Sequence, residues 1–183
     1  MEQTQWNKKF FRAEVIGAVL LCVLAPLFHF TYEWSLNNTF VGIISAVNES
    51  VWEHTKIIYF PYLFLSIIEY FIIKPDFKRF FAAKSISLAL IPAIMIAFFY
   101  TYTGAFGIES LAIDIGFTFV LSAIAYVISY KLYQSERNIE KYFVVLLVMF
   151  AAVLLMELLF TAFAPHIPLF QSSVDGSFGF PTA

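Results

Sequence analysis

The sequence predicts an all-α membrane protein whose five transmembrane helices form a single domain over residues 1–183. Hydrophobic residues make up 61% of the chain and charged residues only 13%. Charged residues normally account for about a quarter of a soluble domain, and a soluble fold of this length cannot bury so much apolar surface. We therefore expect lipid to surround most of the chain. The net charge of −2 offers no overall basic character, so nucleic acid is not an expected partner.

Five apolar segments are long enough to span a bilayer, for which a helix needs about 20 residues. They cover approximately residues 14–33, 51–73, 82–102, 109–131 and 142–164. Helices are the expected form because an open strand edge would leave backbone hydrogen bonds unmet in hydrocarbon. The apolar stretch at 39–47 is too short to span the membrane, and we expect it to be re-entrant or interfacial.

Basic residues predict the orientation of the spans. Except for Lys56, every lysine and arginine lies in or beside the N-terminal segment, the connection after the second span or the connection after the fourth span. Such lysine- and arginine-rich connections are usually cytoplasmic. We therefore expect a cytoplasmic N-terminus and an extracytoplasmic tail at 165–183. Apolar residues of this tail, such as Ile167 and Phe180, should fold it back over the outer face and bring His166 to a site there.

The segment "NESVWEH" at 48–54 places several ionisable residues at the outer start of the second span. Ser50 and Glu53 fit a capping box, in which each side chain accepts a hydrogen bond from the other residue's backbone N–H. Glu49 suits the positive N-terminus of the same helix. Capping does not explain His54, which is either an ordinary interfacial residue or part of a functional site.

All three histidines fall on the predicted outer side. His29 is near the end of the first span, His54 is at the start of the second, and His166 follows the fifth. Imidazole and carboxylate groups together bind zinc and other divalent metals. We therefore expect the three histidines to be ligands of a divalent metal such as zinc. The sequence contains no HExxH, paired-cysteine or GxSxG motif, so this prediction rests on the one-sided clustering.

Glu53, Asp114 and Glu157 are the predicted catalytic carboxylates. Asp114 and Glu157 lie inside apolar spans, where an ionisable side chain costs on the order of a few kcal/mol and usually faces a partner or water. A carboxylate beside a metal-bound water can act as a general base or orient a ligand. The chain would then hydrolyse a lipid-like or small amphipathic substrate while embedded in membrane lipid.

Two other functions fit the same residues, so the sequence leaves open whether the protein is an enzyme. In an ion- or proton-coupled transporter, Asp114 and Glu157 would bind the cation within the membrane. The inner halves of the spans are strongly apolar apart from Glu69, which argues against a continuous path. In a non-catalytic membrane module, the outer face would bind a lipid or a partner protein.

Two further carboxylates, Glu14 and Glu69, lie near the predicted cytoplasmic boundary. Arg12 and Lys74 are close to them in the sequence. Long basic side chains at a membrane boundary extend their charged ends toward water. We therefore expect Glu14 and Glu69 to form surface or snorkelling pairs with these residues.

The segments "HFTYEW", "NESVWEH" and "PHIPLFQSSVDGSFGF" together resemble an uncharacterised, domain-of-unknown-function family of small multi-pass membrane proteins from Gram-positive bacteria. The resemblance extends from about His29 to Phe180 and implies a multi-pass protein of the bacterial plasma membrane, with no established activity. The residue types are also similar to those of three-histidine intramembrane hydrolases, such as alkaline ceramidases and adiponectin-type receptors. Those proteins have seven helices and an additional Ser and Asp pattern, so this second likeness is an analogy.

Overall fold

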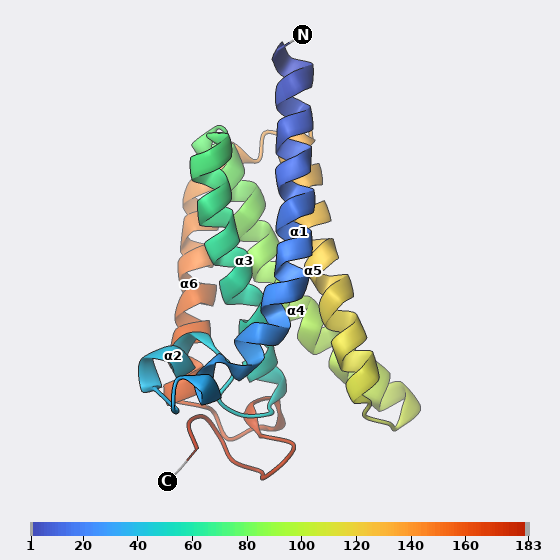
Figure 1. Cartoon of the computed structure of the whole chain (residues 1–183), viewed down its shortest axis with the longest axis vertical. Helices are drawn as coiled ribbons and strands as arrows, with labels where there is room; N and C mark the ends of the chain where they lie inside the picture. Colours follow the sequence, from blue (N-terminus) through green and yellow to red (C-terminus); the bar gives the residue numbers. More distant parts are fainter. Residues whose placement is uncertain (1, 182–183) are drawn as a thin grey trace.

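The computed structural model describes residues 2–181 and contains five long helices, two of which diverge from the bundle toward the connection that joins them (Figure 1). They are α1 (Glu2–Trp34), α3 (Val51–Ile73), α4 (Phe77–Phe106), α5 (Leu111–Gln134) and α6 (Phe143–Ala162). All five are long and apolar enough to cross a membrane, which confirms the all-α prediction with five potential spans. Some helices extend past the predicted ends because those ranges counted apolar residues, whereas lysine, arginine and glutamate also favour helix.

Shorter elements lie at the ends of the long helices. The helix α2 (Thr39–Ile44) begins after Asn38, whose side chain accepts hydrogen bonds from the backbone N–H groups of Phe40 and Val41. Single 3-10 turns cover Glu140–Tyr142 and Pro168–Phe170. In Figure 1, α2 and the C-terminal segment lie at the same end of the molecule, opposite the N-terminus. We call this end the α2 end.

Local sequence explains where α3 begins and ends. Ser50 Oγ accepts a hydrogen bond from the Glu53 N–H at 3.3 Å, so the predicted serine cap is confirmed. The reciprocal bond of a capping box does not form, because Asn48 Oδ1 accepts from the Ser50 N–H at 2.9 Å instead of Glu53. At the other end, Lys74 adopts a left-handed φ of 53°. Pro75 follows it and cannot continue the helix.

The helix α3 is the most enclosed of the five. In its most apolar stretch of 18 residues, 61% of the residues are buried inside the protein, against 11% in the corresponding stretch of α6. Outward side chains of α6, such as Val144, Val145 and Val148, are between 65% and 70% exposed. Soluble proteins rarely expose an apolar surface of this extent. We therefore expect lipid to contact this surface of α6. The enclosed helix α3 instead carries polar residues that contact partners inside the bundle.

The C-terminal segment packs over the α2 end. Phe170 contacts Trp52 and Phe160, with ring centroids 5.1 Å and 5.3 Å apart. Gly179 has a φ of 63°, and a Cβ atom at this position would lie 2.5 Å from the Thr161 carbonyl oxygen. Glycine is therefore required where the segment turns against the end of α6.

Candidate metal centre

Two histidines from different helices meet one glutamate at the α2 end. His29 lies near the end of α1, His54 is in the first turn of α3, and Glu49 is in the connection between α2 and α3. The two Nε2 atoms are 3.2 Å apart. The Glu49 carboxylate oxygens lie 3.4 Å from Nε2 of His29 and 3.3 Å from Nε2 of His54. We call these three residues the histidine–glutamate cluster.

The ring of His54 has a defined orientation. Its Nδ1 atom lies 2.8 Å from the backbone carbonyl oxygen of Ser50. A carbonyl oxygen only accepts hydrogen bonds, so Nδ1 carries a proton. In the protonated ring Nε2 also donates to Glu49, whereas in the neutral ring, the form that binds a metal, Nε2 presents its lone pair to the cluster. Metal-bound histidines are commonly held in this way, by donation from the other ring nitrogen to a backbone carbonyl. The Nε2 atom of His29, which faces that lone pair, must then carry a proton or share a cation with it.

Glu49 supplies the negative charge of the cluster. Hydrogen bonds from His29 and His54 hold the pKa of its carboxyl well below the usual range. The carboxylate is half-buried and stays ionised near neutral pH. An anionic oxygen beside two imidazole nitrogens is a donor set suited to a divalent metal ion.

The residues around the cluster fix its geometry from two sides. The backbone N–H and the hydroxyl of Ser173, in the C-terminal segment, contact the Glu49 carbonyl oxygen at 3.3 Å and 3.2 Å. On the other side, Ser45 Oγ donates to the Phe28 carbonyl oxygen at 2.7 Å, one residue before His29. The loop that carries Glu49 is therefore tied both to the C-terminal segment and to the helix that carries the first histidine.

A cavity of about 240 Å³ opens beside the cluster. It is lined by His29, Tyr32, Glu33, Asn37, Ala46, Val47, Asn48, Glu49 and Pro181. A small molecule in this cavity would meet an imidazole and a carboxylate of the cluster, together with Glu33 and Asn48. A larger cavity of about 450 Å³ lies at the opposite end of the bundle, beside Lys74 and Arg79, and does not touch the cluster.

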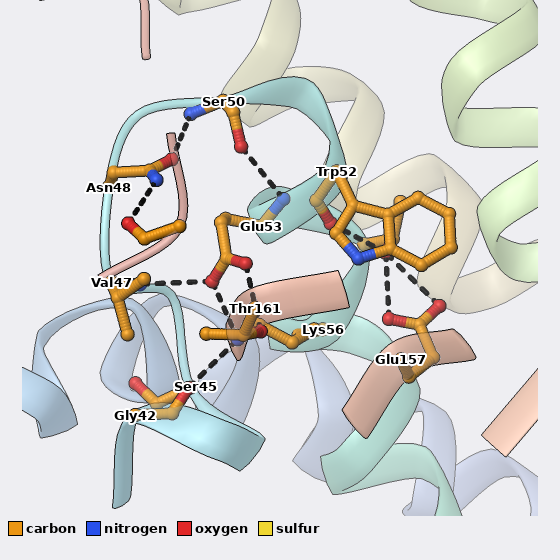
Figure 2. Close-up of polar contacts among 12 residues, drawn as sticks. Gly42, Ser45, Val47, Asn48, Ser50, Trp52, Glu53, Lys56, Glu157 and Thr161 are labelled. Carbon is orange, nitrogen blue, oxygen red and sulfur yellow. Dashed lines mark hydrogen bonds and ion pairs between the residues drawn. The ribbon is translucent and has the colours of Figure 1, made fainter. Parts of the chain in front are cut away.

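Glu53 belongs to a separate, sealed network (Figure 2). Its carboxylate lies 2.6 Å from Lys56 Nζ and accepts from the Thr161 hydroxyl at 3.0 Å. The oxygen beside Lys56, Oε2, also accepts from the Val47 N–H at 3.1 Å. Lys56 and Glu53 are both fully enclosed. The structure therefore does not bring Glu53 to the histidines, although sequence reasoning made it a candidate base.

Asp114 and Glu157, the other predicted catalytic carboxylates, also have partners elsewhere. Asp114 accepts a hydrogen bond from the Tyr102 phenol at 2.7 Å, which joins α4 to the start of α5. Glu157 is buried in α6, with both carboxyl oxygens 3.1 Å from the Thr55 hydroxyl. Neither carboxylate is a member of the cluster, which comprises His29 and two ligand groups from the α2–α3 region.

Two of the three predicted metal ligands come together, and the third does not. His166 lies on the exposed side of the C-terminal segment, with its ring centroid 4.6 Å from that of Phe178. The segment buries Phe170 and leaves the histidine exposed. Glu49 takes the third place in the cluster. Glu49 was not predicted as a ligand because its charge was explained by the nearby helix N-terminus. Its position five residues before His54 in the same polar segment was a usable signal.

Glu14 and Glu69 are buried inside the bundle, which corrects the expectation that they form surface pairs. Their exposed fractions are 3% and 7%. Lys84 Nζ lies 2.9 Å from a Glu14 oxygen and 2.7 Å from a Glu69 oxygen. We call these three residues the lysine–carboxylate centre. The expectation was wrong because the basic residues closest in sequence are not the closest in space once α1, α3 and α4 pack together.

A family model described as a family of unknown function (DUF6512) matches residues 1–180. No curated protein and no solved structure gives a significant match to the chain. The matched range includes the histidine–glutamate cluster and the lysine–carboxylate centre. The family description names no activity, so function has to be argued from the geometry of these sites.

Proposed function

Because the chain belongs to the DUF6512 family, whose function is unknown, we propose a function from its geometry: His29, Glu49 and His54 bind one divalent metal ion, best matched by zinc. The site would lie on the extracytoplasmic face of a multi-pass protein of the bacterial plasma membrane, since lysine and arginine gather toward the other end. The metal would activate water to hydrolyse a lipid-like or small amphipathic substrate.

The spacing of the donor atoms is the observation that carries the metal assignment. Zinc bonds to imidazole nitrogen and carboxylate oxygen are about 2.0–2.2 Å long, so two donors on a tetrahedral ion lie about 3.3–3.6 Å apart. The two imidazole nitrogens are 3.2 Å apart, and each lies near its own oxygen of the Glu49 carboxylate, at 3.4 Å for His29 and 3.3 Å for His54. One donor atom from each of the three residues lies within 4.8 Å of the other two. The donors therefore stand close to the spacing that a zinc ion needs. Two imidazoles and one carboxylate also leave a fourth position for water or substrate.

The adjoining cavity supports a substrate with a small polar group. Its volume of about 240 Å³ is below the roughly 300–1,000 Å³ of most small-molecule sites. A headgroup or a short polar end fits, while an acyl chain would stay in the surrounding lipid. Glu33 lines the same cavity and is the carboxylate best placed to take a proton from a metal-bound water.

Metal analysis of the purified protein in detergent tests the assignment. After exposure to zinc and removal of the excess, we expect about one zinc ion per chain. His29→Ala, His54→Ala and Glu49→Gln should each lower zinc affinity at least about tenfold. His166→Ala is the matched control, because it removes the same type of side chain at the same end of the bundle but outside the cluster, and it should retain zinc.

Two results would contradict the metal site: wild-type protein that holds no zinc, or equal loss of zinc from the His166→Ala and His54→Ala variants. Hydrolysis is tested separately, with zinc-loaded protein in vesicles that contain fluorescent phospholipid and short-chain acyl ester probes. Glu33→Gln should slow release of product without lowering the zinc content. Zinc binding without turnover of any probe would favour the alternative of a non-catalytic binding module.

Ion- or proton-coupled transport is the second candidate function. It is supported by the lysine–carboxylate centre, because the half of the bundle expected to be apolar contains buried charged groups. Such groups within spans commonly mark ion or proton pathways. Cation uptake into vesicles that is unaffected by both Asp114→Asn and Glu157→Gln would show that these two residues do not bind the transported cation.

A further inference from the structure

The lysine–carboxylate centre joins four helices in the half of the bundle away from the α2 end. Lys84 of α4 lies between Glu14 of α1 and Glu69 of α3, at 2.9 Å and 2.7 Å from their nearest oxygens. Ser129 of α5 donates to the other oxygen of Glu14 at 2.9 Å. All four side chains are buried, so the centre is closed to water on every side that these helices provide.

The charges of the centre do not balance when all three groups are ionised. Two carboxylates and one ammonium leave a net charge of −1. In the described part of the chain, no lysine, arginine or histidine other than Lys84 forms an ion pair with either carboxylate. Besides the two carboxylates, the Lys84 ammonium faces the rings of Tyr62, Phe80 and Tyr126. Ring faces are negative, so they do not offset the excess charge, and an uncompensated buried charge is strongly unfavourable.

Unpartnered polar atoms point to the same imbalance. The Oε1 atom of Glu69 is buried and has no hydrogen-bond partner among the described residues. An ionised oxygen in that position has lost its water without gaining a donor, whereas a neutral carboxyl loses far less. The hydroxyl groups of Tyr62, Ser87 and Tyr126 are also buried without partners in the same part of the structure.

We propose that the lysine–carboxylate centre is a proton-binding site, in which Glu14 and Glu69 share one proton and Lys84 stays charged between them. The proton brings the net charge to zero, and the two carboxyls titrate as a coupled pair because both face the same ammonium. The titratable groups that face the centre are Glu14 from α1, Tyr62 and Glu69 from α3, Lys84 from α4 and Tyr126 from α5.

A proton fits this site better than a metal cation. Lys84 Nζ already occupies the position between the two carboxylates, so a sodium ion would have to sit beside an ammonium of the same sign. A proton adds to a carboxyl oxygen and needs no new space. The centre is separate from the histidine–glutamate cluster and does not rest on zinc binding. It gives the protein one bound proton within the membrane, the element that a proton-coupled carrier requires.

Infrared spectroscopy of the purified full-length protein at neutral pH tests the proposal, since a protonated carboxyl has a carbonyl band that shifts on transfer to heavy water. All variants are made in the Glu157→Gln background, so that the separate buried carboxyl of Glu157 adds no band of its own. Glu14→Gln and Glu69→Gln should each remove the same band, because the remaining carboxylate then pairs one-to-one with Lys84. Lys84→Met should increase that band about twofold, because both carboxyls then lack a counter-ion. Glu109→Gln, in the exposed α4–α5 connection, is the matched control and should leave the band unchanged.

Each variant gives a separate reading, so any one that folds decides the matter. A band of undiminished strength in either glutamine variant means that the centre is fully ionised and overturns the proposal. So does a Lys84→Met protein without a gain in the band. Replacing potassium by sodium in the buffer should have no effect, and loss of the band on adding sodium would show that a metal cation occupies the site instead. His54→Ala should leave the band intact, which separates this site from the proposed metal centre.

Discussion

Lys56 and Thr161 are 105 residues apart in the sequence, yet Lys56 Nζ and Thr161 Oγ1 lie 2.6 Å apart in the network of Figure 2. This bond ties α3 to α6. Lys56 also donates to the Gly42 carbonyl oxygen at 2.8 Å, which ties both helices to α2. One lysine side chain therefore holds together three elements of the α2 end.

Removing the charge of Lys56 should destabilise the protein strongly. Lys56→Met leaves the Glu53 carboxylate buried without its counter-ion, and breaking a buried pair in this way costs about 3–5 kcal/mol. Thermal or denaturant unfolding in detergent measures the change. Lys131→Met, at an exposed position of α5, is the control and should change the free energy of unfolding by about 0.5 kcal/mol or less. Equal effects of the two variants would show that the network does not support the fold.

A methyl group at Gly42 should disturb the C-terminal segment. A Cβ atom there would lie 2.5 Å from the Phe180 ring and 2.7 Å from a Val47 methyl. Overpacking of this kind costs about 1–3 kcal/mol, and the segment should become easier to cleave by added protease. Gly104→Ala is the matched control, because nothing lies near a Cβ at that helical position, and alanine there should stabilise α4 by up to about 1 kcal/mol. Unchanged protease resistance in Gly42→Ala would contradict the packing.

The contribution of Glu49 to the free energy of unfolding should depend on pH. Its pKa in the folded protein lies below the about 4.3 of an unfolded glutamate, because His29 and His54 donate hydrogen bonds to it. The resulting stabilisation is fully present above the unfolded pKa and is lost as the pH falls toward the folded pKa. Glu49→Gln should therefore cost about 1 kcal/mol or less at pH 6, since the carboxylate is partly screened by solvent. Unfolding of metal-free protein at a series of pH values should show this difference shrinking in acid, and a difference that grows would refute it.

Glu157 should tolerate replacement by its amide. The Thr55 hydroxyl is 2.7 Å from the Trp52 carbonyl oxygen and 3.1 Å from both Glu157 oxygens. Its single proton cannot serve both partners, and donation to the carbonyl requires Glu157 to donate in turn as a protonated carboxyl. Glu157→Gln preserves such a bond and should change the free energy of unfolding by about 0.5 kcal/mol or less. Glu157→Leu should cost about 1 kcal/mol or more, because the buried Thr55 oxygen then lacks a donor. Equal losses in the two variants would indicate an ionised carboxylate.

Zinc should stabilise the folded protein through the histidine–glutamate cluster. A ligand that binds only the folded state at a hundred times its dissociation constant adds about 2.7 kcal/mol to the free energy of unfolding. The midpoint of thermal unfolding should therefore rise with zinc and fall again with a chelator. This response should disappear in His54→Ala and persist in His166→Ala. Stabilisation of both variants to the same extent would place the metal elsewhere.

The helices were predictable from the sequence because hydropathy is a property of consecutive residues. Ser50 was predictable for the same reason, since a cap acts on the backbone three residues away. Asn48 was missed as the partner of the Ser50 N–H, because several side chains in one polar segment compete for that donor. The long-range contacts of Lys56 carry no such local signal, and they tie α2 and the end of α6 to α3.

The candidate site was predictable in part. Span topology places His29 and His54 on one side, and the structure brings them into contact. The position of His166 depends on which side chains of the C-terminal segment turn inward, and composition does not determine that. Glu14 and Lys84 lie 70 residues apart, and their pairing follows only from how the helices rotate against one another.

The order of these partners along the chain sets an order for assembly during synthesis. Both glutamates of the lysine–carboxylate centre leave the ribosome before Lys84, so that centre can close as soon as α4 enters the membrane. Thr161, which completes the network around Lys56, belongs to the last long helix. Until that helix is inserted, Lys56 on α3 lacks its partner Thr161 and faces lipid or the translocon. A nascent chain that stops before that helix would thus display an unfinished polar surface on α3.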